Sequence, residues 1–163
     1  MASSRPIVRQ INWFAIIPQF SVLFICIFLY FQIKAGDPVL FGAGTYLFLS
    51  LLLRNLIPRY HRKGIKFYKS GQFEKAIQEF EKSFNFFTKH EWIDKYRSII
   101  LLSSSGISYL EMAMVNMAFC YGQLGDGEKS KELYEKTLLK FPDSQMAISS
   151  LKMYESAKHI KQI

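Results

Sequence analysis

The chain has 163 residues, of which 50% are hydrophobic, and carries a formal net charge of +8 at pH 7. This length suits about one domain, but the apolar residues gather in the first third, which excludes a uniformly patterned soluble domain. The two cysteines, Cys26 and Cys120, lie in regions of different character. We therefore expect no disulfide, in keeping with a reducing compartment.

Two apolar segments open the chain, and both are expected to be transmembrane helices. The first covers about 11–33 without a charged residue, and the second covers about 39–57, with Arg54 near its end. About 20 apolar residues span a bilayer as a helix, and a long Arg side chain can reach the interface. Gly36 marks a tight turn between the segments. We expect residues 1–57 to form a membrane anchor built as a helical hairpin.

The two apolar segments also allow alternatives to a membrane hairpin. They could be buried helices of a soluble core, or the first could be a cleaved signal peptide, although the apolar part of such a peptide is typically about 7–15 residues long. A small transporter is disfavoured because ionisable residues mark transport paths, and none precedes Arg54 in the segments. Gly42 and Gly44 form a smooth patch where the two segments pack or where another helix approaches.

Basic residues flank the apolar segments and predict their orientation. Arg5 and Arg9 precede the first segment, and Trp13 and Tyr30 near its ends suit an aromatic belt. The bases at and beyond the end of the second segment are Arg54, Arg59, Arg62, Lys63, Lys66 and Lys69. The positive-inside rule places both termini in the cytoplasm. We expect a two-pass protein of a bacterial inner membrane, or of an organelle membrane with the domain facing the cytosol.

The same basic residues indicate which kinds of partner the protein can bind. Basic side chains beside a membrane span attract anionic lipid headgroups, which makes the lipid bilayer an expected partner. No basic stripe interleaved with base-stacking aromatics accompanies the charge, so we expect no nucleic acid.

In the remaining residues, 58–163, one pattern of residues occurs twice. Each position of the first copy is separated from its counterpart in the second copy by the same number of residues that separates Gly71 from Gly125. In each copy a small residue and an aromatic precede a turn glycine, and a second helix shows small, aromatic and small residues on one face. The first copy consists of Gly64, Phe67, Gly71, Ala76, Phe80 and Ser83, and the second of Ala118, Tyr121, Gly125, Ser130, Tyr134 and Thr137, closed by Pro142. Each copy predicts a helical hairpin with a glycine turn.

This pattern resembles the tetratricopeptide repeat (TPR), a helix–turn–helix unit of about 34 residues with a closing proline. The resemblance is carried by GIKFYKSGQFEKAIQEFEKS (64–83) and NMAFCYGQLGDGEKSKELYEKTLLKFPDS (116–144). The expected divisions are repeat 1 at about 57–88, an insert at 89–110, repeat 2 at 111–144 and a cap at 145–163. The expected fold is all-α: a transmembrane helical hairpin followed by a short TPR-like α-solenoid with a C-terminal capping helix.

The insert presents an apolar face at helical spacing, made by Trp92, Tyr96 and Ile99. This face either packs within the solenoid or is a contact face for a partner or a membrane. A break is expected at Ser103–Gly106, where one of the serines caps a helix that begins near Ile107.

The resemblance also implies a function, because TPR arrays bind protein segments in the groove lined by the first helix of each unit. The groove candidates are Tyr60, Lys63, Phe67, Tyr68, Met112, Asn116, Phe119 and Gln123. We expect a membrane-anchored scaffold or adaptor that assembles membrane-associated protein partners on the cytoplasmic face. The alternative is an accessory subunit of a larger integral-membrane complex, bound through the hairpin. The sequence leaves the oligomeric state open.

No constellation for catalysis is found in the sequence. His61, His90 and His159 are scattered without metal-ligand spacing, and we expect them on exposed helix faces. Neither a P-loop nor a dinucleotide-binding fingerprint occurs. We therefore expect no enzyme activity, no catalytic residue, no cofactor and no metal site.

Overall fold

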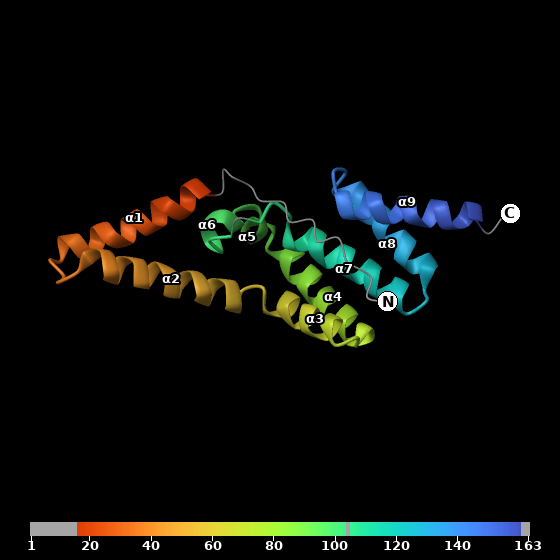
Figure 1. Ribbon diagram of the computed structural model, residues 1–163, viewed down its shortest axis with the longest axis horizontal. Coiled ribbons are helices and arrows are strands. Elements are labelled where there is room, and N and C mark those ends of the chain that lie inside the picture. Colours follow the sequence, from red (N-terminus) through yellow and green to blue (C-terminus); the bar gives the residue numbers. More distant parts are fainter. Residues whose placement is uncertain (1–15, 104, 161–163) are drawn as a thin grey trace. The chain divides into compact units, whose positions relative to one another are not determined.

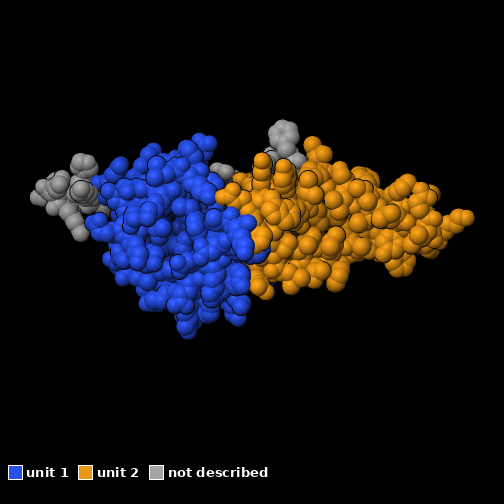
Figure 2. All heavy atoms as spheres, turned by 180° about the vertical axis from the view of Figure 1, so that it is seen from behind, with its two compact units in different colours: residues 1–9, 60–89, 107–163 blue, residues 10–59, 90–106 orange. Residues whose placement is uncertain are grey.

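The structure, a computed structural model, describes residues 16–103 and 105–160, and its regular elements in these ranges are helices, with no strand (Figure 1). The all-α prediction is confirmed. The chain divides into two compact units that are interleaved in the sequence (Figure 2). Among the described residues, unit 1 contains 60–89 and 107–160, and unit 2 contains the rest. The insert expected within the helical domain therefore groups largely with the apolar hairpin.

Unit 2 begins with two helices that pack against each other, α1 (Ile16–Gln32) and α2 (Pro38–Leu56). Asp37 caps α2 by accepting a hydrogen bond from the backbone N–H of Leu40 at 3.1 Å. Pro38 opens the helix, a position where its missing N–H has no cost. Residues 11–15 of the first expected segment, including Trp13, lie outside the described residues, as do Arg5 and Arg9.

Among the described helices, α2 alone is long and apolar enough to cross a membrane. Its 19 residues bury only Gly42 and Ser50. The described part of α1 is apolar but shorter, at 17 residues. Large apolar side chains of both helices are exposed: Ile17, Phe20, Phe24, Ile25, Phe28, Leu29, Phe31, Val39, Leu40, Phe41, Leu47, Phe48, Leu51, Leu52 and Leu56.

The rest of unit 2 consists of two short helices, α5 (Glu91–Lys95) and α6 (Arg97–Ile100), and α6 packs against α1. The chain then turns at Leu102, whose backbone adopts a left-handed conformation with φ of 47°. Arg54, expected to extend toward the interface, is instead bonded to this turn. Its Nε donates to the carbonyl of Leu101 at 3.2 Å, and its Nη2 donates to the carbonyl of Leu102.

Unit 1 contains a first helix pair, α3 (Arg59–Lys69) and α4 (Phe73–Lys89). They pack closely at Gly64, where an added Cβ would lie 2.6 Å from the Phe80 ring. The turn between them passes through Gly71 at φ 73°, a conformation that side chains with a Cβ rarely adopt.

A second helix pair follows, α7 (Tyr109–Gln123) and α8 (Gly127–Lys140), with Gly125 at φ 84° in the turn. The cap of α7 is Ser108, whose Oγ accepts a hydrogen bond from the N–H of Glu111 at 3.0 Å, so the expected cap among Ser103–Ser105 was wrong.

The helices of unit 1 pack in succession: α4 on α7, α7 on α8, and α8 on α9 (Gln145–Ile160). Two apolar clusters hold them together. The first centres on Phe80 and Cys120, and the second on Tyr134 and Ala147. The small and aromatic positions of the sequence pattern that lie buried in these contacts are Gly64, Ala76, Phe80, Ser83, Ala118, Ser130, Tyr134 and Thr137. Tyr121 is half-buried, and Pro142 is exposed.

Candidate functional site

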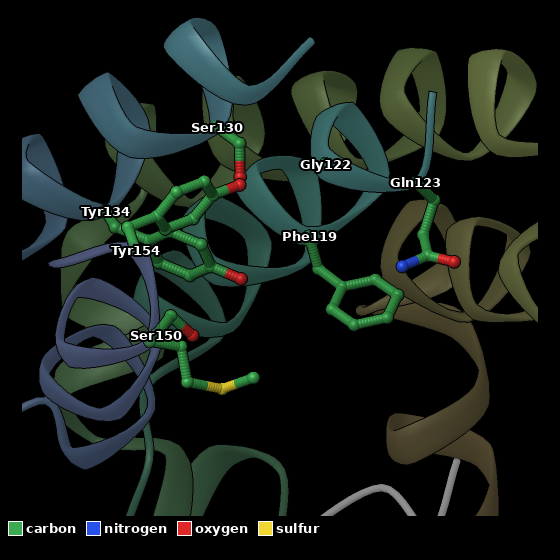
Figure 3. Close-up of a pocket in the computed structure, with 8 residues that line it drawn as sticks. Phe119, Gly122, Gln123, Ser130, Tyr134, Ser150 and Tyr154 are labelled. Carbon is green, nitrogen blue, oxygen red and sulfur yellow. The ribbon is translucent and has the colours of Figure 1, made fainter. Parts of the chain in front are cut away.

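A pocket of about 300 Å³ opens between three helices of unit 1 (Figure 3). Its lining residues come from α7 (Phe119, Gly122, Gln123), α8 (Ser130, Tyr134) and α9 (Ser150, Met153, Tyr154). The rings of Tyr134 and Tyr154 lie side by side with centroids 6.5 Å apart, while Phe119 and Gln123 lie on the other side. The site is thus mainly apolar, with three aromatic rings and a few polar groups, the composition usual for binding pockets.

The pocket exists because small residues line its wall. A Cβ added to Gly122 would lie 3.2 Å from both the Ser130 Oγ and the Tyr154 hydroxyl, so any larger residue there would crowd this wall. Ser130 is only 1% exposed, and its Oγ has no hydrogen-bond partner among the described residues. An unpaired buried hydroxyl costs free energy that a bonded ligand can recover.

Tyr134 supplies the buried phenol of the pocket. Burial raises the pKa of this phenol, and a hydrogen bond with Ser150 opposes the shift only in part. The phenol therefore stays neutral and can donate a hydrogen bond at physiological pH. Together with the Ser130 hydroxyl, it provides the polar part of an otherwise apolar surface.

The structure brings some of the expected groove residues together and separates others. Tyr68 and Phe119, from the two expected repeats, contact through their rings with centroids 5.4 Å apart. Phe119 and Gln123 also line the pocket. The other expected groove residues do not line it: Tyr60, Lys63, Phe67, Tyr68, Met112 and Asn116. Of these, Lys63 is exposed and the rest are half-buried.

Residues that sequence reasoning did not assign to binding make up most of the pocket. The sequence pattern gives Ser130 and Tyr134 only packing positions, and Met153 and Tyr154 lie in the segment expected to cap the solenoid, 145–163. Met153 is 73% exposed at the pocket, which is unusual for a large apolar side chain. The signal in the sequence was the set of large apolar residues in 145–163, namely Met146, Ile148, Leu151, Met153 and Tyr154.

The expected contact face of the insert lies in unit 2. Trp92, Tyr96 and Ile99 are 58%, 51% and 52% exposed, respectively. All three belong to the α5–α6 segment, and none of them lines the pocket.

His61 departs from its expected exposure. It is buried in unit 1 between Phe80 and Tyr109, with ring centroids 5.4 and 5.3 Å away, and its Nδ1 has no hydrogen-bond partner in the part of the chain that the structure describes. Burial lowers the pKa of this imidazole to about 4. Cys120 is likewise buried and free, and burial raises the pKa of its thiol to about 12. Both groups are therefore neutral core residues.

Within residues 16–103 and 105–160, no group of three or more His, Cys, Asp or Glu side chains is placed to hold a metal. In comparisons of the chain with protein-family models, curated proteins and solved structures, no match was found. Functional inference therefore rests on the chain's own residues.

Proposed function

We propose that this protein is a membrane-anchored helical scaffold that binds a protein partner through its TPR-like unit. The observation that carries the proposal is the combination, in one chain, of an apolar helix pair with exposed side chains and a helical unit with an open aromatic pocket. The first part fixes the protein to a bilayer, and the second part recruits the partner. The partner is expected to be membrane-associated, because the anchor restricts the diffusion of this protein to the membrane surface.

The membrane assignment is supported by the surface of α1 and α2. Exposed Phe, Leu and Ile side chains cover both helices, and burial of such surface from water is favourable by roughly 25 cal/mol per Å². A soluble monomer rarely exposes so extended an apolar surface. In this proposal α1 crosses the membrane together with α2, and the Lys34–Asp37 turn lies on the far side.

The scaffold assignment is supported by the packing of the small and aromatic residues of the repeated pattern. Gly64 makes room for Phe80, and the equivalent Ala118 packs in one cluster with Tyr134. Each pair holds two helices close together, as the TPR resemblance implies. In this proposal α9 closes the stack, and its Met153 and Tyr154 complete the pocket for an apolar side chain of the partner.

The pocket is tested by a pair of matched substitutions in the full-length protein. Met153→Asp places a charge at the pocket, and Leu139→Asp makes the same change at an 85% exposed residue of α8 that does not line it. Both changes lie at exposed positions, so stability should change little. Partners that co-purify from gently solubilised membranes should be lost with Met153→Asp and kept with Leu139→Asp, with circular dichroism as a check of folding.

The outcome against the scaffold proposal is equal recovery of the same partners with both variants. Recognition would then lie outside the pocket, and an accessory subunit that joins a larger complex through α1 and α2 would be the better description. Substitutions on the outer face of α2, such as Leu47→Ala and Leu51→Ala, would then be expected to release the partners, because both side chains are exposed.

The orientation is tested separately by cysteine labelling. In a Cys26→Ser background, Gly36→Cys marks the expected outer turn and Ser70→Cys marks the expected inner side, and both positions are exposed. In sealed right-side-out vesicles a membrane-impermeant maleimide should label Gly36→Cys and leave Ser70→Cys unlabelled until the membrane is opened. Labelling of both variants from one side would exclude the two-pass arrangement.

A further inference from the structure

The α5–α6 segment exposes large apolar side chains, which are usually buried in soluble proteins. Trp92, Tyr96 and Ile99 are each more exposed than buried, although all three are large and apolar. Trp92 lies on α5, Ile99 lies on α6, and Tyr96 joins the two helices. A face of this kind points to surroundings other than bulk water.

Two charged side chains of the same segment, Asp94 and Arg97, are shielded from solvent, whereas Glu91 and Lys95 are exposed. Asp94 is buried, and Arg97 lies beside it with Nη1 4.0 Å from the Asp94 Oδ1. Arg97 also donates hydrogen bonds to the carbonyls of Asp94, Ser105 and Gly106, at 2.9 to 3.0 Å. These bonds hold the segment in one shape, so the exposed face is built into the fold and is not a consequence of a loose loop.

The segment is attached to the open end of the hairpin. Arg54, near the end of α2, donates to the carbonyls of Leu101 and Leu102, and α6 packs beside α1 (Figure 1). The Lys34–Asp37 turn, which joins α1 to α2, is at the opposite end. With a rise of about 1.5 Å per residue, α2 is about 28 Å long, close to the hydrocarbon thickness of about 30 Å. The Arg54 side chain therefore fixes the segment at the level of the membrane boundary.

We propose that the α5–α6 segment lies in the membrane interface, with Trp92, Tyr96 and Ile99 inserted between lipid headgroups and the upper acyl chains. This inference rests on the proposed function, in which α1 and α2 are in the bilayer. Trp and Tyr favour this zone because their rings are apolar at one end and polar at the other. The segment then acts as a second, monotopic contact with the lipid bilayer.

Lipid is favoured over a protein as the occupant for two reasons. The face belongs to the same compact unit as the exposed apolar surface of α1 and α2, and it is packed on α1. Its charge is balanced, because Glu91 and Asp94 match Lys95 and Arg97, so it suits zwitterionic and anionic headgroups alike. A second copy of the chain is the competing occupant, and the experiment distinguishes it.

The test uses the full-length Trp13→Phe variant, which leaves Trp92 as the only tryptophan, because the chain has two. The variant is reconstituted in phosphatidylcholine vesicles that contain lipids brominated either near the headgroup or near the acyl-chain end. Emission from Trp92 should be quenched more by the shallow bromine label than by the deep one, and only weakly by aqueous iodide. The control, Trp13→Phe with Trp92→Phe and Leu139→Trp, should show strong iodide quenching and no bromine effect, because Leu139 is highly exposed.

Two results would overturn the inference. If iodide quenches Trp92 as strongly as it quenches the tryptophan introduced by Leu139→Trp in the control, Trp92 lies in water. If neither iodide nor the bromine labels quench Trp92, protein covers it, which indicates a second copy of the chain. Alkaline carbonate extraction of the same vesicles tests separately whether α1 and α2 hold the protein in the bilayer. Protein released by carbonate contradicts the proposed function itself, whereas protein retained with Trp92 in water contradicts only the interfacial segment.

Discussion

A Cβ atom added to Gly42 would lie 2.6 Å from the Cα atom of Ile27, so α1 and α2 cross with their backbones in close contact. The nearby Gly44 is different, because an added Cβ there meets nothing within 4 Å. Of the two uses considered for these glycines, packing within the hairpin applies to Gly42. Close approach of this kind is the usual reason for glycine in paired membrane helices.

Gly42→Ala should weaken the hairpin, whereas Gly44→Ala should not. Insertion of a methyl group into a tight contact costs about 1–3 kcal/mol, whereas alanine at an open helical position is favoured over glycine by up to about 1 kcal/mol. The free energy of unfolding in mild detergent, followed by circular dichroism during denaturant titration, measures the difference. Equal stability of the two variants would show that α1 and α2 do not cross at Gly42.

Gly64→Ala should destabilise unit 1 for a similar reason. The new methyl group would lie 2.6 Å from the Phe80 ring, and the expected loss is about 1–3 kcal/mol despite the better helix propensity of Ala. A double-mutant cycle with Phe80→Leu checks the cause, because a smaller side chain relieves the clash. The two changes should therefore combine less than additively, and strict additivity would disprove the contact.

The buried imidazole of His61 should make stability depend on pH. Its pKa falls from 6.5 to about 4 on folding, so the unfolded chain binds a proton more readily between these values. The contribution of His61 to the free energy of unfolding is therefore fully present above about pH 6.5. It is lost as the pH falls toward 4, and the loss reaches up to about 3 kcal/mol. Denaturant titrations at several pH values measure the slope.

One variant separates the His61 contribution from that of the carboxylates, which also respond to acid. His61→Leu should remove most of the slope between pH 4 and 6.5, whatever its effect on stability at neutral pH. An unchanged slope in His61→Leu would mean that His61 is protonated in the folded protein.

Cys120 should resist thiol reagents in the folded protein. It is fully buried and burial raises the pKa of its thiol to about 12, so almost no thiolate is present at pH 8. In a Cys26→Ser background, Ellman's reagent should react only after denaturation. Rapid reaction of the native variant would contradict the packing of α7 against α4 and α8.

The sequence predicted the parts of the fold that rest on local patterns. The all-α class follows from helical periodicity, and the positive φ of Gly71 and Gly125 occurs at the glycines assigned to turns. The burial of His61 could not be found in this way, because Phe80 and Tyr109 come from distant positions. The capping of α7 by Ser108 was missed because several serines nearby are equally good N-cap residues.

The candidate sites were predicted less well, and the reason is again long-range contact. The pocket needs α9 beside α7, and nothing in the pattern of either helix specifies which side chains meet. The grouping of 90–106 with α1 and α2 depends on Arg54, whose acceptors lie far along the chain. A single charge at the end of an apolar segment has several possible partners, and the sequence does not select among them.

The Arg54 contact also has a consequence for biosynthesis. Its acceptors lie 47 and 48 positions later in the chain, beyond all of α3 and α4. In the proposed membrane arrangement, a ribosome therefore delivers α2 to the bilayer well before Leu101 and Leu102 have been synthesised, and the guanidinium must first bind water or lipid phosphate. Only after α3 and α4 have emerged can the chain return and exchange those temporary ligands for carbonyl oxygens. The complete packing of unit 2 thus waits for residues that are translated after the first helix pair of the other unit.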